Sequence, residues 1–424
     1  GIFDGQNHVI SGLTIDRPVT MTVGLFGYVG SGGNISNVGL EGGSIVARGE
    51  VGGLAGRNLG MINNAYVTGT VTAKARDFVG GLVGTNNGTI SNAYATGAVS
   101  GVGKVGGLVG INTGYSVLRN VYATGTVKGG NSVGGLVGFS SNHGAISNAY
   151  ATGAVTGARA VGGLVGVISG RDTTLSNVYA TGTVTGSNSN VGGLVGQTSD
   201  ASISNAYATG AVKGGNRTGG LVGNLFGLGI GNAYATGAVT GSMDVGGLVG
   251  YSDTASINYT YATGLVKGRQ NVGGLVGRYI ESRYQSRGIT SSFWNKQTTR
   301  QARGLGTSYI ITTADVTGLT TAQMKTLSRF SDWDIDNKGG TGTVWRIYDG
   351  YTVPLLRSFM KELTVIGGSA SKTYDGNAIS ADVGTLTFSD ANYDTSLVKG
   401  TVQAYYTANS ANAGTYTGSN LEMT

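Results

Sequence analysis

Histidines and acidic residues, the side chains that most often carry out catalysis, are few and scattered in this sequence. The 424 residues include only two histidines, His8 and His143, and no cysteine. A zinc site or a histidine-based triad requires several such side chains to converge. We expect both histidines to be surface residues without a catalytic role, and the sequence predicts neither a metal site nor a cofactor.

The acidic residues also lack the pairing that glycoside hydrolysis requires. That reaction needs two carboxyl groups within about 5–10 Å of each other. Acids occur singly in separate variable segments, as at Asp77, Asp172, Asp200, Asp244 and Asp253. Asp200 and Asp253 are the best placed to share one face, yet two repeats separate them, about 10 Å on the strand spacing used below. The sequence therefore predicts a protein that is not an enzyme.

A tyrosine that recurs at a nearly constant interval is the first candidate for binding. The copies are Tyr66, Tyr94, Tyr122, Tyr150, Tyr179, Tyr207, Tyr234 and Tyr261. Aromatic ring faces pack against sugars, and the hydroxyl adds a polar group. Strand alternation would place Tyr94 with Ile90 and Asn92 on one side, and Ala93 with Ala95 on the other. Because the tyrosine never varies across eight copies, we favour a structural ladder in the core or stacked at a turn, and expect the neighbouring asparagines to form a hydrogen-bonded turn ladder.

A row of basic residues is the second candidate. It follows the "AV" or equivalent of successive repeats and consists of Lys104, Lys128, Arg159, Lys213, Arg217, Lys267 and Arg269. Such an edge could attract an anionic polysaccharide or lipopolysaccharide. The alternative is that these charges only keep the protein soluble and discourage lateral association.

The element that positions these residues is a repeat of about 28 residues. The leucine of "GGLVG" or its variant marks it at Leu25, Leu54, Leu82, Leu108, Leu136, Leu164, Leu194, Leu221, Leu248 and Leu275. Short segments rich in Val, Ile, Tyr and Thr, punctuated by Gly and Asn, predict strands and turns. A propeller blade needs about 40 residues, whereas one coil of a parallel β-helix fits this length. We therefore expect an all-β fold, a parallel β-helix of about ten coils that rise about 4.8 Å each.

Composition agrees with a β-solenoid and excludes several other classes. The chain has 80 glycines but two prolines, 39% apolar residues and 12% charged residues. Collagen and general disorder are excluded on these figures. The net charge of +7 is too dispersed to indicate nucleic-acid binding. No run approaches the roughly 20 apolar residues of a membrane span.

Three regions are expected. Residues 1–300 form the repeat solenoid, and residues 301–360, where the repeat stops, form a capping segment that covers its open end. Thr320 or Thr321 is expected to start the one short helix of this segment, which runs to about Arg329 with Leu327 and Phe330 facing the core. Residues 361–424 form a small β-rich module that is truncated at its end.

Several motifs resemble parts of large bacterial exported proteins. "GGLVG" followed by "NAYATG" is similar to the GLUG repeat, and "FDGQNHVISGLTI" resembles the stretch that introduces such arrays. "LTTAQMKTLSRFSDWD" and "WRIYDGYTVPLLRSF" resemble the segment after the array in two-partner-secretion exoproteins of the filamentous-haemagglutinin type. "SKTYDGNA" with "NAGTYT" is similar to YDG or MBG-like modules. The resemblance implies a secreted or surface-bound adhesin and an outer-membrane secretion partner.

Three functions are compatible with this reading. The first is a segment of a surface adhesin that attaches cells or joins a biofilm matrix through carbohydrate or cell-surface partners. The second is a rigid stalk that projects binding domains located elsewhere. The third is ice binding by the threonines of "YATGTV", although the bulky tyrosines beside them disfavour a flat surface.

Overall fold

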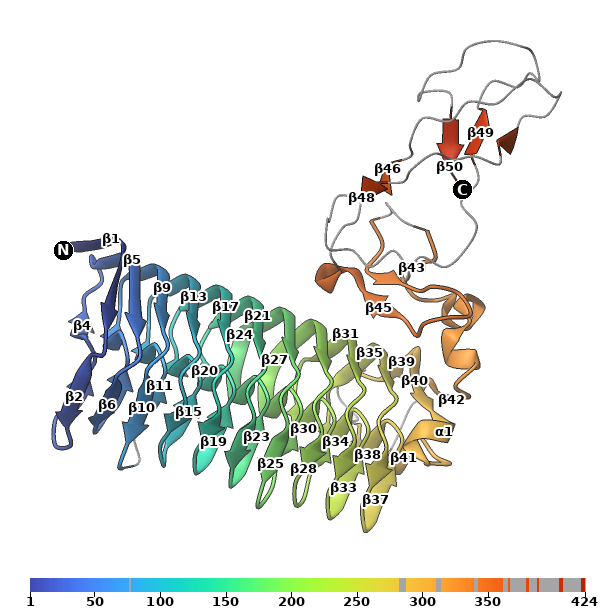
Figure 1. Ribbon diagram of the computed structural model, residues 1–424. Helices are drawn as coiled ribbons and strands as arrows, with labels where there is room; N and C mark the ends of the chain where they lie inside the picture. The colour runs from blue at the N-terminus through green and yellow to red at the C-terminus, as the bar shows by residue number, and fades with distance from the viewer. Residues whose placement is uncertain are drawn as a thin grey trace. The chain divides into compact units, whose positions relative to one another are not determined.

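The computed structural model describes residues 1–75, 78–281, 287–309, 314–338 and 342–360, and five short strands beyond them. The chain divides into two compact units, Gly1–Ser358 and Phe359–Thr424. The first unit is a parallel β-solenoid in which each coil contributes strands to three sheets (Figure 1).

The first sheet has 22 strands and follows the solenoid from end to end. Its strands are β1 (Ile2–Ser11), β4 (Phe26–Val29), β5 (Asn34–Glu41), β8 (Ala55–Asn58), β9 (Met61–Val67), β12 (Val83–Asn86), β13 (Thr89–Ala95), β16 (Val109–Asn112), β17 (Val117–Ala123), β20 (Val137–Ser141), β21 (Ala145–Ala151), β24 (Val165–Ala180), β27 (Val195–Ala208), β30 (Val222–Phe226), β31 (Gly229–Ala235), β34 (Val249–Asp253), β35 (Ser256–Ala262), β38 (Val276–Ile280), β39 (Ile289–Thr290), β40 (Ser292–Asn295), β41 (Leu305–Tyr309) and β42 (Val316–Leu319).

The second and third sheets have ten strands each. The second sheet contains β2 (Thr14–Arg17), β6 (Ser44–Ala47), β10 (Thr70–Ala73), β14 (Val99–Ser100), β18 (Val127–Lys128), β22 (Val155–Gly157), β25 (Val184–Gly186), β28 (Val212–Lys213), β32 (Val239–Thr240) and β36 (Val266–Lys267). The third contains β3 (Thr22–Val23), β7 (Glu50–Gly52), β11 (Phe78–Gly80), β15 (Lys104–Gly106), β19 (Asn131–Gly134), β23 (Arg159–Gly162), β26 (Val191–Gly192), β29 (Thr218–Gly219), β33 (Met243–Gly246) and β37 (Gln270–Gly273).

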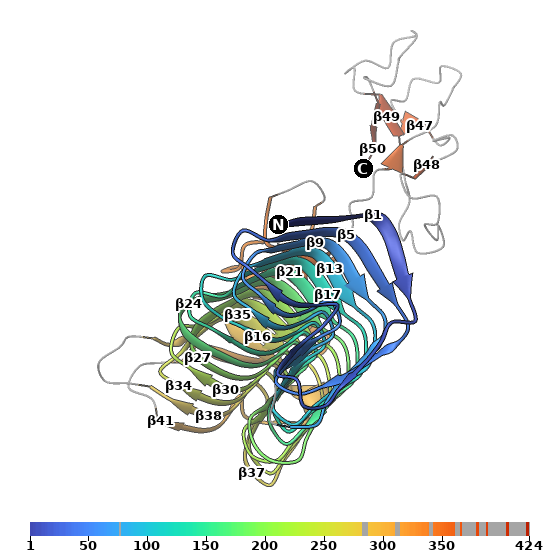
Figure 2. The same cartoon turned by 90° about the vertical axis from the view of Figure 1, so that its left-hand side faces the viewer.

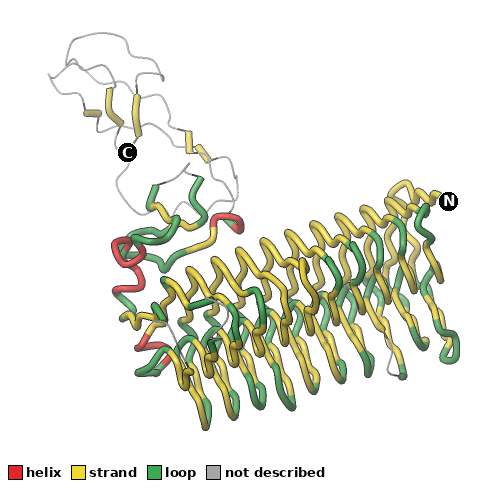
Figure 3. The backbone as a smooth tube through the Cα atoms, turned by 180° about the vertical axis from the view of Figure 1, so that it is seen from behind, coloured by secondary structure: helices red, strands yellow, loops and turns green. Residues whose placement is uncertain are grey.

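Every strand of the solenoid pairs in parallel with its copy one coil away. Tyr94 lies beside Tyr122, and Val99 lies beside Val127, so the register equals the sequence repeat. Figure 3 shows the strands of successive coils aligned in rows. Ten complete coils are followed by a partial turn formed by β39, β40 and β41. The predicted parallel β-helix of about ten coils is thereby confirmed.

The interior consists of two columns of apolar side chains. The main core contains ladders such as Leu82, Leu108 and Leu136, all without exposed surface. A second core, built almost entirely from valines such as Val99 and Val127, lies between the second and third sheets, in the narrower lobe that Figure 2 shows end-on. Identical residues stack well because each side chain meets the same shape above and below, which explains why the repeat is so faithful.

The "VGGLVG" segment folds the chain back on itself where the narrow lobe joins the main body. A Cβ on Gly110 would lie 2.5 Å from the backbone nitrogen of Val79 and 2.6 Å from the carbonyl oxygen of Gly84. Backbone atoms cannot move aside as side chains can, so only glycine fits. We call this fold between the third sheet and the following first-sheet strand the crease.

The first sheet continues beyond residue 300, because β41 pairs with β38 and β42 pairs with β40. Between β40 and β41 lies α1 (Lys296–Thr299), a short helix that was not expected from the sequence. The Asn295 side chain caps it by accepting hydrogen bonds from the backbone nitrogens of Gln297 and Thr298 at 3.0 and 3.2 Å.

The helix expected from Thr320 to Arg329 is wrong in type and extent. Thr320 does start a turn, since it exchanges capping hydrogen bonds of 2.9 and 3.2 Å with Gln323. The chain then forms two 3₁₀ turns, η1 (Gln323–Lys325) and η2 (Leu327–Phe330), because Thr326 between them is extended. Phe330 is buried as expected, whereas Leu327 is only half-buried and Met324 is buried in its place.

The rest of this segment folds into a small sheet of β43 (Ile335–Asp336), β44 (Trp345–Arg346) and β45 (Leu355–Leu356), followed by η3 (Arg357–Phe359). It packs on the flank of the last coils: the Tyr261 hydroxyl donates to the carbonyl oxygen of Pro354 at 2.8 Å. We call residues 320–358 the flank segment.

The second unit contains two small antiparallel arrangements. β46 (Val365–Ile366) pairs with β48 (Thr387–Phe388), and β49 (Ala404–Tyr406) pairs with β47 (Ile379–Ser380) and β50 (Leu421–Met423). The motifs that suggested a YDG or MBG-like module, at 371–378 and 412–417, lie outside the described residues.

Candidate functional site

The recurring asparagine forms a corner in the strand. Asn92, Asn120 and Asn148 all have a positive φ of about 50°, at 51°, 54° and 49°. The amide of Asn120 donates to the Asn92 side-chain oxygen at 3.1 Å, and that of Asn148 donates to Asn120 at 3.2 Å. The ladder continues through Asn177 and Asn205. The expected hydrogen-bonded asparagine ladder is thus confirmed.

This corner reverses the expected alternation of side chains. Ile90 and Ala93 both point into the core and are fully buried, while Tyr94 lies on the outer face and is half-buried. The expectation that Ile90 and Tyr94 share one side is wrong, because the left-handed backbone at Asn92 interrupts the two-residue period. The structure therefore places the tyrosines outside the core.

The tyrosines stack on one another along the outer face. Neighbouring ring centroids from Tyr66 to Tyr261 lie 4.7–5.0 Å apart, with interplanar angles of 1–5°. Each inner ring has both faces covered by its neighbours. The ladder therefore offers ring edges and hydroxyls, and sugars cannot stack on its ring faces.

The two ends of the tyrosine ladder are closed by different partners. At the first end, the Tyr66 hydroxyl donates to the Glu41 carboxylate at 2.8 Å, which raises the pKa of Tyr66 to about 12. At the last end, Tyr261 is fully buried under the flank segment, and Trp345 donates its indole N–H to the Asn232 side chain at 3.0 Å. Burial, together with the neighbouring Tyr179, raises the pKa of Tyr207, two coils before Tyr261, to about 12.

The predicted basic edge divides between different surfaces. Lys128, Lys213 and Lys267 lie exposed on the second sheet. Arg159 and Arg269 are exposed near the tip of the narrow lobe. Lys104 and Arg217 lie at the crease instead: the Lys104 amine is 5.0 and 4.6 Å from the ring centroids of Phe78 and Phe139, and the Arg217 guanidinium is 4.3 Å from that of Tyr251. The seven residues do not converge on one site.

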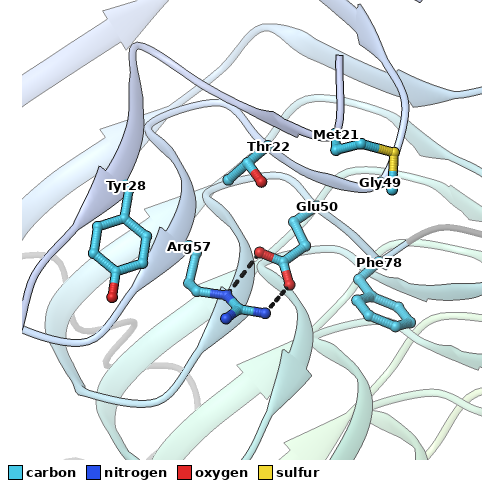
Figure 4. Close-up of a pocket in the computed structure, with 7 residues that line it drawn as sticks. All are labelled: Met21, Thr22, Tyr28, Gly49, Glu50, Arg57 and Phe78. Atoms are coloured by element: carbon cyan, nitrogen blue, oxygen red, sulfur yellow. Dashed lines mark hydrogen bonds and ion pairs between the residues drawn. The ribbon is translucent and has the colours of Figure 1, made fainter. Parts of the chain in front are cut away.

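The crease holds a cavity of about 370 Å³ near the first coils (Figure 4). Its lining includes Met21, Tyr28, Glu50, Arg57 and Phe78, which come from three successive coils. Arg57 donates to Glu50 through Nε at 2.8 Å and through Nη2, and this bond raises the pKa of Arg57. The Tyr28 ring is 57% exposed. Figure 4 shows Tyr28 on one side of the ion pair and Phe78 on the other.

One other polar pair repeats the Glu50–Arg57 arrangement farther along the crease. Asn190 donates to Gln197 at 2.8 Å across the same fold, and the two residues are separated by seven positions, as Glu50 and Arg57 are. Asn271 accepts from Thr307 of the facing wall at 2.7 Å and donates to Asp244, its neighbour one coil earlier on the same wall, at 2.6 Å. Side chains on the two walls of the crease therefore meet in several coils.

The sequence carries a signal for the crease that the tyrosine and basic-residue patterns do not show. The residue directly after each "GGLVG" or "GGLAG" forms one wall, and it changes from coil to coil while the motif does not. From the second coil these residues are Arg57, Thr85, Ile111, Phe139, Val167, Gln197, Asn224, Tyr251 and Arg278. Stacking constrains the motif itself, so variation at its border marks a position free to serve recognition.

Three of the acidic residues considered for catalysis contact different partners. Asp172 lies 3.4 Å from His143, whose ring stacks on Tyr115. Asp253 accepts a hydrogen bond from Tyr251 at 3.3 Å, and Asp244 bonds Asn271. Among the described residues, no three His, Cys, Asp or Glu side chains are grouped to hold a metal ion. Asp77 lies outside the described residues.

Comparison with known proteins identifies the repeat. The model of the GLUG motif matches residues 47–72, 101–128, 129–156, 157–185 and 187–213, so the chain contains a GLUG-repeat region. Halomucin of Haloquadratum walsbyi is 43% identical over 76 residues, which are 18% of this chain and 1% of halomucin. No solved structure matches the chain. In the described part of the chain, no helix is long and apolar enough to cross a membrane.

Proposed function

We propose that this chain is a non-catalytic segment of a large secreted bacterial surface adhesin. It would mediate attachment or association with a biofilm matrix through carbohydrate or cell-surface partners. The observation that carries the proposal is the separation of the repeat into an invariant stacking framework and a variable border at the crease. A framework of this kind presents different side chains at regular intervals without changing its backbone.

The comparisons support the surface assignment. GLUG motifs match five segments of the solenoid, and the similar protein halomucin carries a name that denotes a mucin. The chain spans about 1% of halomucin, so the function of the whole protein is inferred from a small part. Outside the cell, a rod without cysteine relies on hydrogen-bond ladders and packing rather than on disulfides.

Export by a two-partner pathway, with an outer-membrane secretion partner, is part of the same proposal. It is supported by the order of segments in the sequence, in which an introductory stretch, the repeat array, the flank segment and a β-rich unit follow one another. The proposed division at residues 300 and 360 rests on the same order. Co-expression with a candidate secretion partner, followed by detection of the protein in the medium, tests export.

A glycan array and a pull-down with matrix polysaccharides test the adhesive function. The chain of 424 residues is expected to bind at least one glycan. Changing Lys104, Lys128, Arg159, Lys213, Arg217, Lys267 and Arg269 to Ser tests the basic edge, and retained binding removes that edge from the proposal. If this chain binds nothing while the full-length protein still adheres, adhesion lies elsewhere.

A rigid stalk is the second candidate, and one observation favours it. The tyrosine faces are covered by one another and the asparagine amides bond to neighbouring coils, so the most faithful positions serve only the stacking of coils. A stalk predicts that adhesion depends on the number of coils rather than on their side chains. Ice binding is not proposed, because the threonines of "YATGTV" come two and four residues after outward-facing tyrosines, whose rings interrupt a flat surface.

A further inference from the structure

We propose that the cavity at Glu50 and Arg57 is a binding site for a neutral pyranose unit of a glycan. The inference rests on the proposed adhesive function and names the site and the ligand chemistry. Its volume of about 370 Å³ falls within the range of about 300–1,000 Å³ typical of small-ligand sites. The site lies at the crease, where side chains vary from coil to coil.

The aromatic walls supply the surface on which a sugar ring packs. Tyr28 belongs to β4 and is 57% exposed, and unlike the tyrosines of the ladder it has no stacking partner among the described aromatic contacts. Phe78 lies on the opposite side of the ion pair (Figure 4). Pyranose C–H groups pack on aromatic faces, and an exposed tyrosine provides both a face and a hydroxyl.

The ion pair supplies hydrogen-bonding groups that hold a fixed orientation. Glu50 is 12% exposed and Arg57 is 42% exposed, so the carboxylate anchors the guanidinium from below. The bonds to Glu50 use Nε and Nη2 of Arg57, so Nη1 takes no part in this pair. A planar guanidinium held in this way donates to sugar hydroxyls in a defined direction.

The charge balance of the site favours a neutral sugar over a uronate or a sulfated sugar. The charge of Arg57 is offset by Glu50. Lys104 lies over Phe78, which separates it from Glu50 in the strand register Glu50, Phe78, Lys104. An anionic sugar would compete with the Glu50 carboxylate for the Arg57 guanidinium. This differs from the anionic ligand that the basic edge suggested.

Binding of defined oligosaccharides to the whole chain tests the proposal. The probes are maltohexaose, cellohexaose and mannohexaose as neutral chains and hexagalacturonate as the acidic comparison, measured by saturation-transfer NMR and calorimetric titration. We expect at least one neutral chain to bind and hexagalacturonate to bind more weakly. Tyr28→Ala is expected to weaken binding at least about tenfold, and Arg57→Gln by a similar factor.

Tyr115→Ala is the matched control, since Tyr115 is 80% exposed in a loop away from the cavity lining. It should leave affinity unchanged, and circular dichroism should show that each variant is folded. Preference for hexagalacturonate, or unchanged binding by Tyr28→Ala, overturns the assignment of this site while glycan adhesion stands. Absence of binding to any glycan on the array overturns both the site and the proposed function.

Discussion

At the scale of single residues, one asparagine per coil determines which side of the wall each neighbour faces. Its left-handed backbone turns Tyr94 outward and keeps Ile90 and Ala93 inward. Asparagine tolerates this conformation better than other residues with a Cβ, and its amide then bonds the next coil. The sequence predicted the ladder from its regularity. It could not predict the corner, because simple alternation assumes extended backbone throughout.

Two variants of Asn148 separate the contribution of the side-chain hydrogen bonds from that of the left-handed backbone conformation. Replacing it with Ala removes the bonds to Asn120 and Asn177 and places a Cβ at a φ of 49°. We expect a loss of about 1–2 kcal/mol in the free energy of unfolding, measured with urea. Asn148→Gly keeps the backbone conformation and should lose less. Equal losses in the two variants would mean that backbone strain is unimportant here.

The tyrosine ladder predicts a stability limit in alkaline solution. The pKa values of Tyr66 and Tyr207 are raised to about 12 in the folded protein, above the value of about 10 for an unfolded chain. Folding therefore favours the protonated phenols, and this stabilisation is complete below about pH 10 and lost as the pH rises through about 12. Urea unfolding at a series of pH values, together with absorbance titration of tyrosine, should show the loss. Tyr66→Phe should reduce it.

At the scale of elements, the strands could be predicted from the sequence, whereas the structure of the flank segment and the crease could not. The strands and their period follow from the repeat. The helix from Thr320 does not, because the extended Thr326 divides it while Phe330 and Trp333 pack against Phe293 from the solenoid. The crease was missed because its side chains meet only after the chain folds back between the third sheet and the following strand.

Gly166 tests the close backbone contact at the crease. A Cβ there would lie 2.5 Å from the carbonyl oxygen of Gly138 and from the backbone nitrogen of Val133. We expect Gly166→Ala to lower the free energy of unfolding by about 3 kcal/mol. Gly231 lies in β31 with nothing within 4 Å of a Cβ, so Gly231→Ala is the control and should change stability by less than about 1 kcal/mol. Similar effects at both positions would refute the contact.

Trp345 tests how the flank segment is held. The Trp345 ring is fully buried, and its centroid lies 6.1 Å from that of the Tyr261 ring. Its indole N–H donates to the side-chain oxygen of Asn232. Trp345→Ala is expected to cost about 3–5 kcal/mol in denaturant unfolding and to expose Tyr261. Trp345→Phe keeps much of the packing but loses the bond to Asn232, and should cost about 1 kcal/mol. A larger cost for Phe than for Ala would contradict the packing argument.

At the scale of the whole solenoid, each coil is an interchangeable unit. Lys128 lies beside Thr156 in the parallel register, so deletion of 129–156 joins two equivalent points. We expect a folded rod that is shorter by about 4.8 Å, detected by X-ray scattering and circular dichroism. Deletion of only 129–142 removes β19 and β20, so one coil loses its third-sheet strand and the first-sheet strand that follows it, and this should prevent folding. If both deletions fold equally well, register does not control the fold.

The direction of the hydrogen bonds between coils also has a mechanical consequence. These bonds run along the axis of the solenoid, from each coil to the next. A pull on the chain end therefore loads the bonds of one terminal coil at a time, as in unzipping, instead of loading many in parallel. Each released coil frees about 28 residues and lengthens the tether by roughly 95 Å. A surface protein built in this way would yield in equal steps under flow and keep the remaining coils intact.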